Sequence, residues 1–308
     1  MLEELFPIPV VFIIFNRPDL ALLTFSEIAK VKPKKLLVIG DGPRSNVPGE
    51  GEKVLEARSI IDKVDWNCEV LTNFSAENLG CKRRVASGLD WVFRLVEKAI
   101  ILEDDCLPSP SFFVFCQEML EQYRNETEVG MIAGINFQKG VRRGDGDYYF
   151  SKYMHIWGWA TWSNRWRNYY DVEMREWPSF KRSKEFSDIT SSKSNKSFWK
   201  KIFEKVYQGE IDTWDYQWVF ANWLHKRLCI IPNVNLISNV GFGQGATHTK
   251  VENELSNLPA CDISFPLKHP GLIEANVVAD QFTEKNYFST SVSDLLKKLS
   301  NKLLRVFK

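Results

Sequence analysis

The sequence shows no excess of either charge. Lysine and arginine total 40 residues, and aspartate and glutamate total 39. Proteins that bind nucleic acid through its phosphate backbone usually carry a clear basic excess. We therefore expect no nucleic-acid partner.

Cysteine is sparse, and its spacing argues against two kinds of site. The six cysteines include no CxxC pair, which disfavours structural zinc, and they are too scattered for a dense disulfide framework. A reducing compartment fits this pattern best. The cysteines are Cys68, Cys81, Cys106, Cys116, Cys229 and Cys261.

Long hydrophobic runs are also missing. The apolar run from Pro9 to Phe15 is too short to span a bilayer and is typical of a strand. The residues before it, Met1 to Glu4, are acidic where a signal peptide would be basic. We therefore expect a cytoplasmic protein without a transmembrane helix.

Several catalytic signatures are absent from the sequence. The four histidines show no HExxH or paired spacing, which argues against metallohydrolase chemistry. Neither a GxSxG elbow nor a GxxxxGK[ST] loop is found, so the serine-hydrolase and P-loop classes receive no support.

What the sequence does contain, up to about residue 136, is an alternation of short apolar runs and helical segments. The predicted strands are 10–15, 36–39, 69–71, 99–102 and 130–134, and the predicted helices are 19–31, 52–64, 81–96 and 111–123. Such alternation predicts an α/β fold with a mostly parallel sheet flanked by helices on both faces. The Ser/Lys-rich segment Lys181 to Ser197 lacks apolar periodicity and predicts an exposed loop.

The most informative segment is the apolar run from Ala99 to Leu102, which ends in Glu103, Asp104 and Asp105. Adjacent ionised carboxylates at the end of a buried strand are costly unless a cation or strong donors compensate them. Hard oxygen ligands suit Mn²⁺ or Mg²⁺, which keep open positions for phosphate oxygens. The segment predicts a site for a metal-bound diphosphate, with an acidic turn as the alternative.

Polar residues also follow two other predicted strands of this half. Arg17 follows the first strand, and Asp41 lies in a Gly-Asp-Gly-Pro turn after the second. Ligands of parallel sheets bind at the carboxyl ends of the strands. There, Arg17 would reach a nucleotide or phosphate, and Asp41 a base or ribose. The alternatives are a surface arginine and a turn aspartate that bonds its own backbone.

A cluster of cations opens the helix predicted from residue 81. Lys82, Arg83 and Arg84 stand at its N-terminus, where backbone N–H groups and cations would together hold a diphosphate. Cations at a helix start are unfavourable for the helix dipole, which favours a functional explanation. The alternative is that one or two of them are simply solvated.

The second half of the chain is rich in tryptophan, since nine of the 11 tryptophans lie between residues 157 and 223. Trp157, Trp159 and Trp214 are candidates for stacking on a sugar acceptor, with core packing as the alternative. Asp215 is a candidate general base, because an apolar pocket raises the pKa of a carboxylate. Asp212 competes for this role, and a surface position is the alternative for either aspartate.

Two further segments suggest ligand or membrane contact. The run 239–249 has three spaced glycines and predicts a mobile flap, from which His248 would reach a phosphate or the metal. On a helix, residues 294–308 would present an apolar stripe beside cations. Such a helix could lie on an anionic membrane surface or pack as an ordinary terminal helix.

The order of these landmarks resembles the GT-A glycosyltransferases. The most similar group is the Golgi N-acetylglucosaminyltransferase I family (glycosyltransferase family 13), and the chain also resembles bacterial nucleotide-diphospho-sugar transferases. The resemblance spans about residues 9 to 249, and its most specific part is Glu103 to Phe113. Cys106 stands where the family has leucine, and Tyr216 stands where it has a second acid. The matching segments are Phe15-Asn16-Arg17, Ile39-Gly40-Asp41, Ile101 to Asp105, Trp157-Gly158-Trp159, Trp214-Asp215 and the 239–248 flap.

The resemblance implies a GT-A (Rossmann-like) fold and a role for each landmark. Arg17 and Asp41 would hold the nucleotide. Glu103 and Asp104 would contact the ribose and the donor sugar, and Asp105 would ligate Mn²⁺. The resemblance also assigns Asp215 as the catalytic base and the 241–248 flap as a cover over the diphosphate.

Together these inferences predict an inverting, metal-dependent glycosyltransferase. It would move a sugar, with GlcNAc expected, from a UDP-sugar to a glycan, a lipid-linked glycan or another hydroxyl acceptor in surface-polysaccharide or glycoconjugate assembly. Residues 1–150 would bind the nucleotide-sugar and metal, 151–260 the acceptor, and 261–308 would form a C-terminal extension. The protein would be cytoplasmic, and peripheral to the inner face of the cell membrane if residues 294–308 bind lipid. The alternatives are a nucleotidyltransferase acting on a sugar phosphate, or a non-catalytic carbohydrate-binding module.

Overall fold

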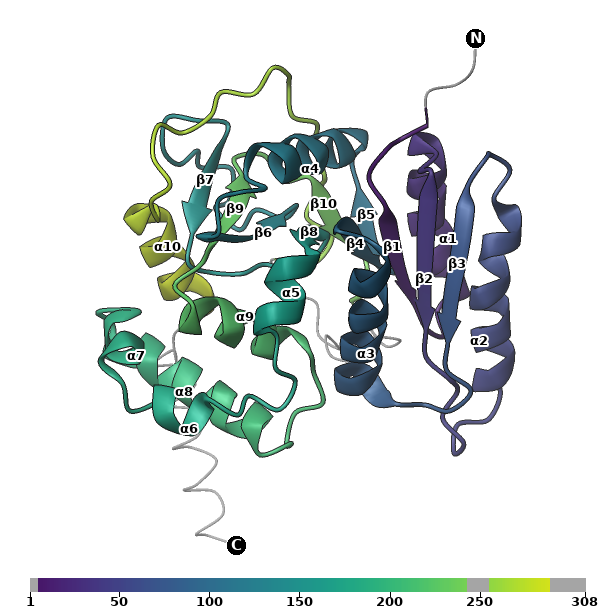
Figure 1. Ribbon diagram of the computed structural model, residues 1–308, viewed down its shortest axis with the longest axis horizontal. Helices are drawn as coiled ribbons and strands as arrows, with labels where there is room; N and C mark the ends of the chain where they lie inside the picture. The colour runs from purple at the N-terminus through teal and green to yellow at the C-terminus, as the bar shows by residue number, and fades with distance from the viewer. Residues whose placement is uncertain (1–4, 243–254, 289–308) are drawn as a thin grey trace, which may run out of the picture.

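The computed structural model describes residues 5–242 and 255–288, which form an α/β fold (Figure 1). An eight-stranded sheet runs in the order β3-β2-β1-β4-β8-β6-β9-β7. The pairs β3/β2, β2/β1, β1/β4 and β6/β9 are parallel, whereas β4/β8, β8/β6 and β9/β7 are antiparallel. The mostly parallel sheet flanked by helices confirms the predicted fold class.

The strands agree closely with the apolar runs of the first half, and additional short strands complete the sheet. They are β1 (Val10–Ile14), β2 (Lys35–Gly40), β3 (Glu69–Phe74), β4 (Lys98–Glu103), β5 (Cys106–Pro108), β6 (Val129–Ala133), β7 (Tyr148–Ser151), β8 (Trp159–Trp162), β9 (Leu228–Pro232) and β10 (Ile237–Asn239). Strands β5 and β10 pair with each other in a separate antiparallel sheet.

Helices cover both faces of the sheet. They are α1 (Pro18–Val31), α2 (Glu50–Ser59), α3 (Gly80–Leu95), α4 (Pro110–Gln122), α5 (Ser163–Tyr169), α6 (Trp177–Phe180), α7 (Lys184–Asp188), α8 (Lys193–Tyr207), α9 (Asp215–Leu224) and α10 (Val277–Tyr287), with a 3₁₀ turn η1 (Ile60–Lys63) after α2.

The burial pattern of β1 explains its unbroken apolar run. Val10 and Phe12 pack in a core with side chains of α1 and α4, whereas Val11 and Ile13 pack in a second core with side chains of α3. All five residues of β1 are buried. A strand covered on both faces needs apolar residues at every position rather than at alternate ones.

The sheet continues from one half of the chain into the other. Strand β4 pairs with β8, with Ile101 opposite Trp159. The change of composition near residue 150 is therefore not a break in the sheet. None of the helices in the described part of the chain is long and apolar enough to cross a bilayer.

The prediction of an exposed loop from Lys181 to Ser197 is wrong, because this segment contains α7 and the start of α8. Each helix begins at a serine whose side chain accepts a backbone N–H, Ser183 for α7 and Ser192 for α8. Phe186 is the buried apolar side chain of α7, and the apolar face of α8 lies mostly after this segment, at Trp199, Phe203 and Val206, so residues 181–197 show no apolar periodicity of their own. His248 and most of the predicted 239–249 flap lie outside the described residues, as does the whole segment 294–308.

Candidate functional site

The loops that follow β1, β2 and β4 lie at one edge of the sheet. Parallel pairing places Ile14 opposite Gly40 and Ile13 opposite Glu103, so the three strands end at nearly the same level. The polar residues predicted to converge at this edge therefore do so.

Arg17 joins the two aspartates that follow β4. Its Nη2 donates to Asp105 Oδ2 at 2.8 Å and also to Asp104 Oδ1. The Arg17 side chain is 19% exposed, and those of Asp104 and Asp105 are 4% and 14% exposed. The backbone N–H of Phe15 adds a bond to Asp104 Oδ2 at 3.3 Å. Arg17 thus supplies compensating positive charge for the buried acids.

Burial shifts the pKa values of the carboxyl groups at the end of β4. It raises the pKa of Asp104 to about 6, although the ion pair with Arg17 acts in the opposite direction. Burial also raises the pKa of Glu103 well above its usual range, and the negative charges of Asp105, Asp104 and Asp215 reinforce this shift. The surroundings of Glu103 therefore favour the protonated form of its carboxyl group more than water does.

Asp105 is held from a second side by the chain that follows β10. The backbone N–H of Val240 donates to the Asp105 carbonyl at 2.9 Å, and Asn239 Nδ2 donates to Asp105 Oδ1 at 3.4 Å. A Cβ added at Gly241 would lie 1.9 Å from Asp105 Oδ2, so this close approach requires glycine. These contacts with Asp105 were not predicted from the sequence. The spaced glycines of the 239–249 run were the only feature of the sequence that pointed to them.

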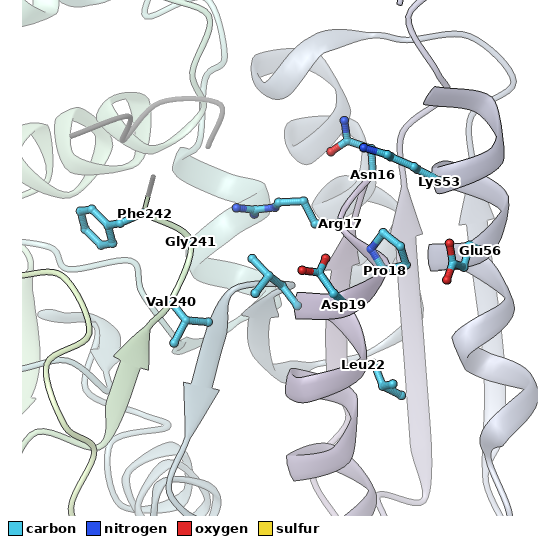
Figure 2. A pocket seen from close by; sticks show the side chains of 11 residues that line it. Asn16, Arg17, Pro18, Asp19, Leu22, Lys53, Glu56, Val240, Gly241 and Phe242 are labelled. Atoms are coloured by element: carbon cyan, nitrogen blue, oxygen red, sulfur yellow. The ribbon is translucent and has the colours of Figure 1, made fainter. Parts of the chain in front are cut away.

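A cavity of about 640 Å³ opens beside this ion pair. It lies between the β1–α1 loop, α2 and residues 240–242. Figure 2 shows Arg17 reaching toward Gly241 and Phe242 across the cavity, with Lys53 and Glu56 on the α2 side. The cavity is large enough to take a nucleotide-sized ligand.

Asp41 bonds to the protein's own backbone. Its carboxylate accepts the N–H groups of Gly42 at 2.9 Å, Leu79 at 2.9 Å and Gly80 at 3.1 Å, and Asn78 Nδ2 at 3.1 Å. Burial raises the pKa of Asp41, and these donors oppose the shift. Because both oxygens already accept hydrogen bonds, a nucleotide base would have to replace some of these donors.

Asp212 occupies the start of α3, where the sequence predicts a diphosphate. Its two carboxylate oxygens accept the backbone N–H groups of Cys81 at 2.9 Å and Lys82 at 3.1 Å. Asp41 takes the two preceding N–H groups. The donors expected to hold a phosphate are therefore already bonded to carboxylates, and Asp212 acts as a tether between α3 and the segment before α9.

The three cations of α3 face different surroundings. Lys82 Nζ pairs with Glu173 at 3.0 Å. Arg83 is exposed, whereas Arg84 is buried and its Nη2 donates to the carbonyl of Asn73 at 2.8 Å. The structure therefore does not gather these side chains around a single anion.

Asp215 is the first residue of α9 and lies within electrostatic reach of the acid-tipped strand. Burial raises the pKa of both Glu103 and the Cys81 thiol, and the charge of Asp215 adds to each shift. The hydroxyl of Thr213 donates to Asp215 Oδ1. The preceding Trp214 is 2% exposed, which fixes the start of α9 in the core.

A second cavity, of about 440 Å³, borders Asp215 and is lined mainly by aromatic and aliphatic side chains. Trp157 and Tyr216 are among them. Trp159 and Trp214 are 0% and 2% exposed, and their rings stack on each other with centroids 5.5 Å apart. Of the three predicted acceptor-binding tryptophans, Trp157 lines the cavity, while the core-packing alternative describes the other two.

The acids at this edge fit a metal that the substrate helps to hold. Within residues 5–242 and 255–288, no three His, Cys, Asp or Glu side chains form a ready-made metal cage. Mg²⁺ and similar ions often take one or two carboxylates and complete their coordination with water and substrate phosphates. Asp105 Oδ1 suits this role because its contacts to Asn239 Nδ2 (3.4 Å) and Cys106 Sγ (3.6 Å) are long.

Comparisons with known proteins find only distant structural similarity. No protein-family model and no curated protein matches the sequence. HddC from Yersinia pseudotuberculosis is similar at 9% identity over 53% of this chain and 81% of that chain, with a TM-score of 0.31. UDP-glucose pyrophosphorylase complexed with UDP-glucose is similar at 10% identity over 73% of this chain and 89% of that chain, with a TM-score of 0.35. At these scores the similarities carry no information about the activity of this chain.

Proposed function

We propose that this protein is an inverting glycosyltransferase that moves a sugar from a UDP-sugar, with GlcNAc expected, to a hydroxyl of a glycan or lipid-linked acceptor. One observation carries the proposal. The acid-tipped strand with Arg17 lies beside one cavity. Asp215, at the start of α9, lies beside a second cavity and near enough to Glu103 for its charge to raise the pKa of that group. Sugar transfer needs such an arrangement, because donor and acceptor must reach a shared reacting centre from two sides.

On the donor side, the larger cavity would take the nucleotide and its diphosphate. Arg17 would place a positive charge near the phosphate oxygens, and the carboxyl group of Glu103 would form a hydrogen bond with a sugar hydroxyl. Asp105, supported by Asn239, would hold Mn²⁺ or Mg²⁺. Such an ion, when bound, stabilises the negative charge that develops on the departing diphosphate.

On the acceptor side, Asp215 would act as the general base. It would take the proton of the acceptor hydroxyl while that oxygen attacks the anomeric carbon on the face opposite the diphosphate. The bond from the anomeric carbon to the diphosphate oxygen then breaks, UDP leaves, and the configuration of the sugar inverts. Thr213 would hold one carboxylate oxygen of Asp215 in place. A positioned base of this kind accelerates a reaction by a factor on the order of 10²–10⁴.

The proposal is tested by incubating the protein with a panel of UDP-sugars and Mn²⁺. We expect slow release of UDP, which a suitable hydroxyl acceptor accelerates. The Asp215→Asn variant should bind UDP as the wild type does, yet lose a factor on the order of 10²–10⁴ in transfer. Conversion of UDP-sugar and pyrophosphate to UTP would instead identify a nucleotidyltransferase. Sugar binding without any turnover would identify a binding module.

A further inference from the structure

A buried carboxylate, that of Glu50, lies behind the wall of the larger cavity. Glu50 is the first residue of α2 and is 2% exposed. It joins the loop after β1 to the loop after β2, because it contacts Asn16 in the first loop and Arg44 in the second. Asn16 lines the cavity. Glu50 therefore acts on the proposed donor site through a neighbour.

Arg44 keeps the carboxyl group of Glu50 ionised. The backbone N–H of Arg44 donates to Glu50 Oε2 at 2.6 Å, its Nε lies 3.0 Å from both carboxylate oxygens, and its Nη2 donates to Oε1. The hydrogen bonds from the Arg44 side chain hold the pKa of Glu50 below its usual range. An ionised carboxylate accepts hydrogen bonds but donates none.

The charge of Glu50 fixes the orientation of the Asn16 amide. Asn16 Nδ2 donates to Glu50 Oε1 at 2.8 Å. The reverse orientation would set the amide oxygen Oδ1 against the carboxylate, so that two acceptors would face each other. Asn16 Oδ1 accepts no hydrogen bond from residues 5–242 and 255–288. Asn16 therefore offers a ligand in the cavity an acceptor rather than a donor.

The position of Asn16 indicates which part of a nucleotide it would contact. Figure 2 shows Asn16 on the α2 side of the cavity, near Lys53, and Gly241 on the other side. The proposed metal ligand Asp105 lies against Gly241, since a Cβ added there would be 1.9 Å from Asp105 Oδ2. A diphosphate bound to that metal would lie on the Gly241 side. The α2 side is left for the nucleoside.

We infer that Glu50 is a positioning residue, which holds Asn16 Oδ1 so that it accepts a hydrogen bond from N3–H of a uracil base. This role rests on the proposed function, because it needs the UDP-sugar to occupy the larger cavity. Asp41, which was expected at the base, already has both carboxylate oxygens bonded to protein donors.

A fixed acceptor selects between the two pyrimidine bases. Uracil N3 carries a hydrogen and donates it, whereas cytosine N3 has a lone pair and accepts. An acceptor held in front of this atom therefore favours uracil. A ribose hydroxyl both donates and accepts, so its recognition would gain nothing from a fixed amide orientation.

Replacing Glu50 with glutamine should reverse this selection. Arg44 only donates, so its N–H groups would take the glutamine oxygen and leave the glutamine NH₂ toward Asn16. The Asn16 amide would then turn its Oδ1 toward that NH₂ and present Nδ2 to the cavity. A donor at this position favours cytosine over uracil.

Calorimetric titration of UDP and of CDP, each with Mn²⁺, tests this role. We expect the wild type to bind UDP about 10–100-fold more tightly than CDP, because the wrong base leaves polar groups unpaired. Glu50→Gln should lower this ratio at least about tenfold. Asn16→Ala keeps the pair of Glu50 with Arg44 and should lower the ratio to a similar extent. Glu52→Gln, the matched control, removes a charge from an exposed position of the same helix turn and should keep the wild-type ratio.

The two nucleotides also separate this role from a purely structural one. A general disturbance of the cavity in Glu50→Gln would weaken UDP and CDP equally, and that result would overturn the role of Glu50. A wild type that binds CDP as tightly as UDP would overturn it as well. Either result would leave the proposed sugar transfer untouched. If the wild type bound neither nucleotide, the proposed donor site would be wrong, and the role of Glu50 with it.

Discussion

Replacing Asp212 with alanine is expected to lower the stability of the protein rather than to abolish sugar transfer. The Asp212 carboxylate accepts the backbone N–H groups of Cys81 and Lys82 at 2.9 and 3.1 Å, at the start of α3. Alanine offers no acceptor, so these two groups would lose their partners and α3 would lose its tether to the segment before α9.

The size of the effect follows from these two bonds. Removing a side chain that caps a helix start typically costs about 0.5–2 kcal/mol. The bonds of Asp212 are charge-assisted, which favours the upper part of this range, but they are exposed to solvent, which screens them. We therefore expect the free energy of unfolding to fall by about 1–2 kcal/mol. Asp212→Asn keeps an acceptor and loses only the charge at the helix start, so its loss should be nearer about 0.3–1 kcal/mol.

Urea unfolding and UDP-sugar turnover, measured on the same samples, separate the two roles considered for Asp212. A tether predicts reduced stability, with transfer by the folded variant close to that of the wild type. Asp215→Asn should show the opposite behaviour, with stability nearly unchanged and transfer lost. If Asp212→Ala unfolded like the wild type but failed to transfer sugar, Asp212 would be the better candidate for the base and its role as a tether would be wrong.

Two further predictions concern Gly241 and Asp280. Gly241→Ala would place a Cβ 1.9 Å from Asp105 Oδ2 and push that carboxylate away from Arg17, so calorimetry should show binding of UDP with Mn²⁺ weakened about 10–100-fold. Gly51→Ala, whose Cβ would meet nothing within 4 Å, is the matched control, and equal binding by both variants would contradict the prediction. Burial raises the pKa of Asp280 from 3.8 to about 6, so between these pH values the native state holds a proton that the unfolded chain releases. The contribution of Asp280 to stability therefore falls as the pH rises from about 4 to 6. Urea unfolding of Asp280→Asn should show a free energy of unfolding that falls by up to about 3 kcal/mol less than that of the wild type between pH 4 and 7. The same pH dependence in the variant and the wild type would contradict this prediction.

The first half of the fold could be predicted because its signals are local. The strand β1 is apolar at every position since it is covered on both faces, and the same pattern recurs in β2 and β4. Parallel pairing then brings the loops after these strands to one edge, which is how Arg17 and Asp105 could be expected to lie near each other. In the second half, residues 181–197 show no apolar periodicity, because α7 is short and the apolar face of α8 lies mostly after residue 197, at Trp199, Phe203 and Val206.

The details of the candidate site depend on contacts between distant segments. Asp212 meets α3 across about 130 residues of sequence, and no local pattern shows that its oxygens are committed to backbone N–H groups. Likewise, Trp159 and Trp214 resemble an exposed platform in the sequence, whereas in the structure they stack on each other inside the core. The support that Gly241 gives to Asp105 also arises only when β10 pairs with β5.

Calorimetric titration of UDP, with and without Mn²⁺, measures whether a metal held by Asp105 contributes to nucleotide binding. The wild type should bind UDP in the presence of Mn²⁺, and binding should weaken at least about tenfold when the metal is chelated or when Asp105 is replaced by alanine. Urea unfolding of Asp105→Ala would verify that the variant is folded. Equal affinity for UDP with and without Mn²⁺, and in the folded variant, would contradict a metal-assisted site at Asp105.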